Sequence, residues 1–280
     1  MKLLTLWRLE LLKLFTQRGA YAGFAVLASL SVLFVWGSWR HGPPGNVQSQ
    51  VSDMFVMGGK LISAQSVCYW MLAIPVAMEV LVPLLIATIS GGLIASEVKA
   101  GTLRTIMVRP VARISLTVAK TLTAWCHAIL LCAFLLVFTF IVSYIAFGGG
   151  DILAAAGGKL TILSAHSAWW RLPLGYALAG VGMCAVASVA LMLSALFENP
   201  LTAAGLTVAF LIVSGVLVTI DYFEFLKPYL LVTHLSVPSE AFHSAISWDA
   251  IESHLSYILP YVAVPPALTA LVIARKDITC

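Results

Sequence analysis

The sequence predicts an all-α integral membrane protein with six transmembrane helices, an N-terminal amphipathic interfacial helix, and a short cytoplasmic helix between spans 2 and 3. Of its 280 residues, 61% are hydrophobic and only 10% are charged, whereas soluble domains carry about 25% charged residues. The apolar residues gather into long runs, and a bilayer core of roughly 30 Å needs about 20 consecutive apolar residues per helix. Lys and Arg residues collect in short connections on one side. We therefore treat residues 1–280 as a single transmembrane domain.

Residues 1–18 have the pattern of a helix that lies in the membrane surface. An apolar stripe recurs at helical spacing and consists of Leu3, Leu4, Trp7, Leu11, Leu14 and Phe15. The polar residues largely opposite this stripe are Lys2, Glu10, Lys13 and Gln17. We expect the basic residues to face anionic headgroups. The alternative is a cytoplasmic extension of the first span. No small-residue cleavage site follows the first apolar run, so we expect that span to be retained.

Six apolar runs follow the interfacial helix. They are residues 20–39, a second run that ends near Ser96, and residues 117–147, 172–197, 201–220 and 255–274. The longer connections between them are 40–73, 148–171 and 221–254. The Gly-rich stretch 147–160 is predicted as a loop because its glycines break helices. The connection 221–254 is apolar enough to pack back on the membrane as short helices.

The distribution of basic residues predicts that both termini are cytoplasmic, because Lys and Arg concentrate in short cytoplasmic segments. With the N-terminus inside, the cytoplasmic basic residues are Lys2, Arg8, Lys13, Arg18, Lys99, Arg104, Arg109, Arg113, Lys120, Arg275 and Lys276. The external ones are Arg40, Lys60, Lys159, Arg171 and Lys227. The sequence thus predicts a multi-pass protein of the cell inner (plasma) membrane. Nucleic acid is not an expected partner, since no soluble basic face is available to follow phosphates.

The sequence shows no catalytic arrangement. The five cysteines form no CxxC pair, and most lie in apolar runs, where a thiol packs as a small hydrophobe. We expect packing rather than metal binding at Cys126, His127 and Cys132. The external histidines, with a metal site as the alternative, are expected to be solvated: His166, His234, His243 and His254. Lys60 and Lys159 follow glycines but lack the rest of a phosphate-binding loop, so we expect neither an enzyme nor a cofactor on this chain.

Glu79 is an ionisable residue within the second apolar run, and such residues are functional hypotheses by default. It precedes Glu97 by 18 residues, which is about 27 Å along a helix. If Glu97 marks the cytoplasmic interface, Glu79 lies near the outer one. We interpret it as an interfacial carboxylate or one at the mouth of a substrate pathway, with a buried proton relay as the alternative.

Residues 97–113 predict a short amphipathic helix beyond the membrane, which we expect to begin at Glu97. Leu103, Ile106 and Met107 recur at helical spacing and form a small apolar face. Arg109 precedes Pro110, and a residue before proline is pushed away from the helical region. A short helix held between two spans can transmit the movement of a cytosolic partner that grips its apolar face. The alternative is a basic loop that only rests on the membrane.

The same residues resemble the membrane subunits of type-2 ATP-binding-cassette (ABC) exporters. The matching string is Glu97-x-x-x-Gly101-Thr102-Leu103-Arg104, then Arg109-Pro110-Val111-x-Arg113, then Ala119-Lys120. In that family a Glu follows the second span, Gly-Thr-Leu opens a coupling helix, and a Lys opens the third span. The ending Arg275-Lys276-Asp277-Ile278 is also similar to the ending of that family.

This resemblance implies that two such permease chains, as a homodimer or with a paralogous permease, form a substrate pathway among membrane lipids. Two copies of a separate ABC ATPase subunit, which binds the ATP and Mg, would dock on the coupling helices. The implied docking residues are Glu97, Gly101, Thr102, Leu103, Arg104, Ile106, Met107, Arg109, Pro110 and Arg113. A second cytoplasmic contact is implied at Phe197, Glu198, Asn199 and Pro200. The alternatives are an ion-gradient-driven secondary transporter and a non-transporting membrane assembly or maturation factor.

Overall fold

The computed structural model describes residues 3–43, 62–74, 76–102, 113–156 and 159–275. Its elements are α1 (Leu3–Thr16), α2 (Arg18–His41), α4 (Ala64–Ala73), the π-helix η1 (Val76–Leu81), α5 (Val82–Lys99), α7 (Arg113–Phe147), β1 (Ile152–Ala156), β2 (Lys159–Leu163), α8 (Ala165–Leu196), α9 (Pro200–Thr219), η2 (Asp221–Tyr229), α10 (Leu231–His234), η3 (Val237–Phe242) and α11 (Trp248–Arg275). Within the described residues, six helical segments are long and apolar enough to cross a membrane. Each corresponds to one predicted apolar run, so the prediction of a multi-pass helical protein is confirmed.

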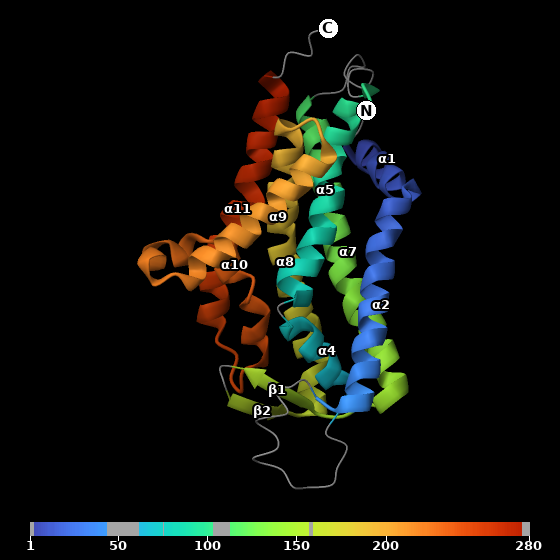
Figure 1. The fold of residues 1–280 in the computed structure, drawn as a ribbon, viewed down its shortest axis with the longest axis vertical. Helices are drawn as coiled ribbons and strands as arrows, with labels where there is room; N and C mark the ends of the chain where they lie inside the picture. Colours follow the sequence, from blue (N-terminus) through green and yellow to red (C-terminus); the bar gives the residue numbers. More distant parts are fainter. Residues whose placement is uncertain (1–2, 44–61, 75, 103–112, 157–158, 276–280) are drawn as a thin grey trace.

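Helix α8 lies at the centre of the bundle. Its apolar window is 78% buried, and helices α5, α7 and α11 pack around it. Helix α9 packs mainly on α5, where Gly91 lets the backbones approach closely. A Cβ at Gly91 would lie 3.0 Å from the backbone nitrogen of Ala204. Small residues at such crossings are the usual means of packing helices in a membrane. Figure 1 shows α2 along the outer edge of the bundle, beside α7.

The bundle has two distinct ends. Helix α1, the end of α5 and the end of α11 lie at one end, at the top of Figure 1, which we call the terminal end. Helix α4 and the two strands lie at the opposite end, which we call the far end. The apolar core is continuous from the middle of the bundle to the far end, where the largest buried side chains include Tyr69, Trp70 and Phe242.

The orientation of α1 differs from the prediction. Leu14 of the predicted stripe faces the bundle, but so do Leu6 and Glu10, and Glu10 was predicted on the polar side. Leu3 and Leu4 of the stripe are exposed. Both faces of this helix carry leucines, so periodicity alone does not select one. The inward face is selected because α1 packs on α7, where Glu10 finds a buried cation.

The Gly-rich stretch 147–160 was predicted as a loop, but part of it forms β-structure. Its second half enters an antiparallel hairpin in which Ile152 of β1 pairs with Leu163 of β2. Helix α4 anchors the hairpin, because the Trp70 indole donates a hydrogen bond of 2.9 Å to the carbonyl of Leu153. Ser66 Oγ also accepts one of 2.9 Å from the Leu153 N–H. Buried backbone groups need such partners, and strand pairing with α4 supplies them here.

The connection 221–254 forms the short helices η2, α10 and η3 before α11 begins, as predicted. The buried Arg171 guanidinium holds the end of η3. It donates hydrogen bonds to the carbonyl oxygens of Ala241, at 3.1 Å, and of His243. A cation at a helix C-terminus satisfies free carbonyl groups and complements the helix dipole. The aromatic side chains of η2 point outward, and Tyr222 is 82% exposed.

Gly175 tests the packing of α8 against η3. A Cβ at this position would lie 2.7 Å from Phe242 Cε2 and 3.0 Å from Leu72 Cδ2. Because overpacking a filled core costs about 1–3 kcal/mol, we expect Gly175→Ala to lower the free energy of unfolding by that amount. The measurement is SDS titration of the purified protein in mixed micelles. Gly205→Ala is the control, since no described atom outside its own helix backbone lies within 4 Å of its Cβ position. Equal stability of the two variants would contradict this packing.

Candidate functional site

The connection between α5 and α7 begins later than predicted. Glu97 was expected to start a segment beyond the membrane, but it lies in the last turn of α5, which continues to Lys99. The helix ends at Gly101, whose φ of 70° is left-handed and is disfavoured for residues with a Cβ. The Gly101 N–H bonds the carbonyl of Val98 at 3.0 Å, as in glycine caps at helix C-termini. The Gly of the Gly-Thr pair therefore terminates the second span and turns the chain.

Four charged side chains meet between α1, the end of α5 and the start of α7, and we call Glu10, Lys13, Glu97 and Lys120 the charge cluster. The Lys120 ammonium lies 2.8 Å from Glu97 Oε1 and 3.2 Å from Glu10 Oε2. Lys13 also pairs with Glu97 Oε1. The side chain of Lys120 is 0% exposed and that of Glu97 is 2% exposed. Charges buried this deeply are rare in membrane segments and nearly always paired.

The hydrogen bonding of Lys120 explains how the cluster tolerates burial. An ammonium has three donors and no acceptor. Lys120 donates hydrogen bonds to Glu10 and to the carbonyl oxygen of Leu93, the latter at 2.9 Å, and forms an ion pair with Glu97. Two acids and two bases leave the cluster without a formal net charge. A buried ion pair offsets its desolvation only when its geometry is good and further hydrogen bonds are made. Lys120 meets this condition through Glu10 and the Leu93 carbonyl, whereas Glu97 Oε2 has no hydrogen-bond partner within the described residues.

The cluster joins the helices that surround the connection. Glu97 lies in the last turn of α5 and Lys120 is the eighth residue of α7, so their contact bridges the helices that precede and follow residues 100–112 in the sequence. Glu10 and Lys13 add α1 to the same network. Arg113, at the start of α7, donates a hydrogen bond of 2.9 Å to the carbonyl of Ala274 in α11. The described ends of the connection are therefore fastened to four helices.

The structure divides the predicted docking residues into three groups. Glu97 is buried in the charge cluster, so its described role is to hold the base of the connection. Gly101 and Thr102 are exposed at the end of α5, and Arg113 binds α11. The residues that lie outside the described part are Leu103, Arg104, Ile106, Met107, Arg109 and Pro110.

The second predicted contact lies close to the charge cluster. Phe197 is exposed, and Asn199 caps α9 by accepting a hydrogen bond of 3.1 Å from the Leu201 N–H. Pro200 lines a cavity of about 220 Å³ together with Glu10 and Lys13. The connection between α8 and α9 thus lies at the same end of the bundle as the end of α5.

Three residues of the charge cluster were not predicted as site residues. Glu10 and Lys13 were expected on the polar, headgroup-facing side of the interfacial helix, and Lys120 was noted only as part of a motif. The available signal was an ionisable side chain inside the third span, which requires a partner. Its partner Glu10 is 110 positions away, so spacing in the sequence does not indicate the pair.

Glu79 lies in η1, at the junction between α4 and α5. It borders a cavity of about 130 Å³ together with Gly215 of α9 and Val232 of α10. Because both neighbours lie near the end of α9 that is remote from the charge cluster, Glu79 sits well away from the terminal end. Its side chain is exposed in the single chain.

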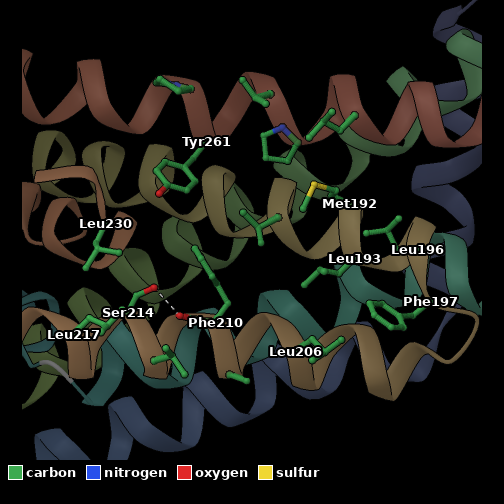
Figure 2. Close-up of a pocket in the computed structure, with 17 residues that line it drawn as sticks. Met192, Leu193, Leu196, Phe197, Leu206, Phe210, Ser214, Leu217, Leu230 and Tyr261 are labelled. Atoms are coloured by element: carbon green, nitrogen blue, oxygen red, sulfur yellow. Dashed lines mark hydrogen bonds between the residues drawn. The ribbon is translucent and has the colours of Figure 1, made fainter. Parts of the chain in front are cut away.

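A large apolar groove runs between α9 and α11, with α8 as its floor (Figure 2). Its volume is about 930 Å³. The hydroxyl of Ser214 donates to the carbonyl of Phe210 at 2.7 Å, and that of Tyr261 donates to the carbonyl of Tyr229 at 2.8 Å. With these hydroxyls satisfied, the wall is suited to hydrocarbon. The residues labelled around it are Met192, Leu193, Leu196, Phe197, Leu206, Phe210, Ser214, Leu217, Leu230 and Tyr261.

The histidines are more structured than predicted. His234 is buried, where a solvated side chain was expected, and its Nδ1 lies 2.9 Å from Nδ1 of His254. Its Nε2 donates to the carbonyl of Pro228 at 2.8 Å, which leaves Nδ1 to accept from His254. This chain of hydrogen bonds links η2, α10 and α11. In the described part of the chain, no three His, Cys, Asp or Glu side chains are placed to hold a metal ion.

The cysteines pack as expected for small apolar residues. Cys68, Cys132 and Cys184 are buried, and no described cysteine forms a disulfide. Burial raises the pKa of the Cys68 thiol to about 12, so it stays protonated and unreactive near neutral pH. His127 packs edge-on against Phe24 with ring centroids 6.0 Å apart.

Six apolar spanning helices with a charged cluster at one end define a multi-pass α-helical membrane protein. The chain belongs to the family described as protein of unknown function (DUF2705), whose model matches residues 45–279. It is similar to the uncharacterized protein YhcI of Bacillus subtilis (strain 168), with 32% identity over 136 residues. The matched region is 47% of this chain and 42% of that relative. The chain thus spans less than half the length of the curated relative it matches.

The charge cluster makes a prediction about stability. Lys120→Met leaves Glu10 as an uncompensated buried carboxylate, because Lys13 still pairs with Glu97. Removing one partner of a buried ion pair costs about 3–5 kcal/mol, so we expect a loss of that size in an SDS titration. The matched control is Lys99→Met, at an exposed lysine of α5, with an expected change within about 0.5 kcal/mol.

The double variant Lys120→Met with Glu10→Gln isolates the electrostatic part of that loss. Glu10→Gln removes the stranded charge while the Lys13 contact with Glu97 remains, so we expect the double variant to be more stable than Lys120→Met alone. Additive losses in the double variant would show that the cluster contributes by packing and not by charge pairing.

Proposed function

We propose that this chain is the transmembrane permease subunit of an ATP-driven ABC exporter. It forms the substrate pathway as a dimer in the inner membrane, with both termini cytoplasmic, and docks a separate ATPase subunit through residues 97–113. The observation that carries the proposal is the 2.8 Å contact between Glu97 and Lys120. These are the first and last charged residues of the exporter-like string. Their contact joins the two helices that this string connects.

The Glu97–Lys120 contact would couple the movement of α5 to that of α7. A cytosolic ATPase that pushes residues 100–112 acts on a connection whose two ends are joined at their base. The push then moves α5 and α7 together, with α1 following through Glu10 and Lys13. Rigid-body movement of packed helices between two discrete states is a common mode of switching. In this proposal the ATP and Mg reside on the ATPase subunit, and the chain itself is not an enzyme.

The shape of the spans supports an apolar or amphipathic cargo. The groove of about 930 Å³ is lined almost wholly by hydrocarbon, and binding sites for small molecules are typically apolar cavities of this size. Glu79 borders a second cavity, which lies on the side of α9 opposite this groove. We propose that Glu79 lies at the mouth of the substrate pathway. Membrane lipids and a second permease chain are the remaining proposed partners.

A proton-coupled secondary transporter is the second candidate function, and His127 is the observation in its favour. This side chain is 1% exposed in the middle of α7, and titratable groups within spans form proton relays in transporters. Neither of its ring nitrogens has a hydrogen-bond partner in the described part of the chain, which leaves it without a described route for a proton. A membrane assembly factor is the third candidate and requires no partner ATPase.

A pull-down tests the docking assignment. The probe is the ATPase subunit that co-purifies with the tagged wild-type chain. Leu103→Asp and Met107→Asp each place a charge on the predicted apolar face, so we expect at least a tenfold loss of co-purified ATPase, equivalent to about 1.4 kcal/mol or more, with normal membrane insertion. The control is Tyr222→Asp, on the remote exposed surface of η2, which should retain the ATPase.

Two results would contradict the proposal. Retention of the ATPase by both Asp variants would remove residues 97–113 as the docking element. Absence of any ATPase from the wild-type preparation would favour the transporter or assembly-factor alternatives, and proton-driven flux in liposomes would then separate those two.

A further inference from the structure

Glu79 is a carboxylate without a described partner. Within the described residues it makes no ion pair and accepts no hydrogen bond, in contrast to Glu10 and Glu97, which are both paired. Its cavity offers no compensation, because none of the other described residues that line it is polar. A lone carboxylate against hydrocarbon is unfavourable unless a cation or water meets it.

The walls of this cavity come from four elements. Val80 and Pro83 follow Glu79 along η1 and α5, Ile212 and Gly215 belong to α9, and Val232 belongs to α10. Together they enclose about 130 Å³. The site thus places one negative charge at the rim of a small hydrocarbon-lined space between two spans.

The backbone at Glu79 departs from the regular α-helix. Pro83 has no N–H to donate to the carbonyl of Glu79 four residues earlier, so the regular α-helical bond cannot form there. The chain preceding α5 adopts the wider π-helix over Val76–Leu81, and Pro83 lies in the first turn of α5. Short π-helical segments are rare and frequently lie at functional sites. The distortion places Glu79 at the junction of α4 and α5, where it borders the end of α9.

The depth of Glu79 matches an amphiphile. It precedes Glu97 by 18 residues, about 27 Å of helix, and it borders Gly215 and Val232 at the end of α9 remote from the charge cluster. This level corresponds to the outer boundary of a hydrocarbon core of roughly 30 Å. A ligand there can keep its charged head at the water interface and its tail in hydrocarbon.

The chemistry of the site selects the kind of cation. An ionised carboxylate only accepts hydrogen bonds, so it favours a cation with N–H donors. Quaternary ammonium groups are usually held by aromatic rings, and the described lining of this cavity is free of aromatic residues. We infer that Glu79 and its cavity bind the head of a cationic amphiphile, a primary or secondary ammonium on a hydrocarbon chain. As a statement about cargo, this rests on the proposed exporter function.

A direct binding measurement tests the inference without an ATPase. The purified full chain is placed in phosphatidylcholine nanodiscs, and binding of radiolabelled dodecylamine is measured by equilibrium dialysis, with empty nanodiscs subtracted. We expect Glu79→Gln to weaken binding about tenfold or more, because it removes a charge-assisted hydrogen bond. Uncharged dodecanol should bind both chains equally. The matched control is Glu224→Gln, which neutralises an exposed carboxylate in η2 and should leave dodecylamine binding unchanged.

A second variant tests the cavity itself. A Cβ at Gly215 meets only Val232 Cγ1, at 4.0 Å, so Gly215→Leu is accommodated and fills the space. It should weaken binding of dodecylamine and dodecanol alike. Equal dodecylamine affinity in the wild type and in Glu79→Gln would overturn the inference, as would undiminished binding of both probes in Gly215→Leu.

The result separates this inference from the exporter proposal. Binding that depends on Glu79, in a chain that captures no ATPase, would keep the ammonium site and remove the exporter. An ATPase that docks on a chain whose dodecylamine binding ignores Glu79 would keep the exporter and remove this cargo class. Competition by phosphatidylethanolamine would identify the ammonium as that of a lipid, whereas competition by soluble alkylamines alone would identify a solute.

Discussion

The contact between Lys120 and Glu97 is the constraint on which the terminal end of the bundle depends. One ammonium, fully withdrawn from solvent, contacts the carboxylates of Glu97 and Glu10 and the carbonyl of Leu93. Buried charges are tolerated only when every donor finds an acceptor in good geometry. The rotation of α1, α5 and α7 about their axes must therefore keep these groups together. A small rotation of any one of these helices would separate the paired charges.

The remainder of the spans is built on different principles. Helix α9 meets α5 through glycine and alanine backbones, yet apolar spaces border it on two sides, the groove shared with α11 and the cavity beside Glu79. Dispersion and close packing hold helices in lipid, where the hydrophobic effect does not draw them together. A charged end held by ion pairs and a loosely enclosed apolar middle suit the proposed function. In that proposal, movement of the ATPase is transmitted through the charged end to a lipid-facing substrate pathway.

Much of the fold could be predicted because a span is a local property. Twenty apolar residues match the bilayer whatever the rest of the chain does, and the predicted runs agree with the helices in number and order. Their ends were less accurate, as for Glu97, because the stop is set by the left-handed Gly101 and not by the change in polarity. Residues 147–160 were harder still. Their glycines indicated a loop, but Ser66 and Trp70 of a distant helix supply the partners that stabilise a hairpin.

The sequence by itself determined the membrane class, the number and order of the spans, and the presence of a charged connection between the second and third. Only the tertiary structure decided that Glu10 turns inward, that Glu97 and Lys120 pair, and that Glu79 borders a cavity with no partner among the described residues. The physical reason is that apolar runs act on the nearest lipid, whereas a charge responds to whatever lies within a few ångströms of it. For Lys120 and Glu10, those few ångströms join positions 110 residues apart.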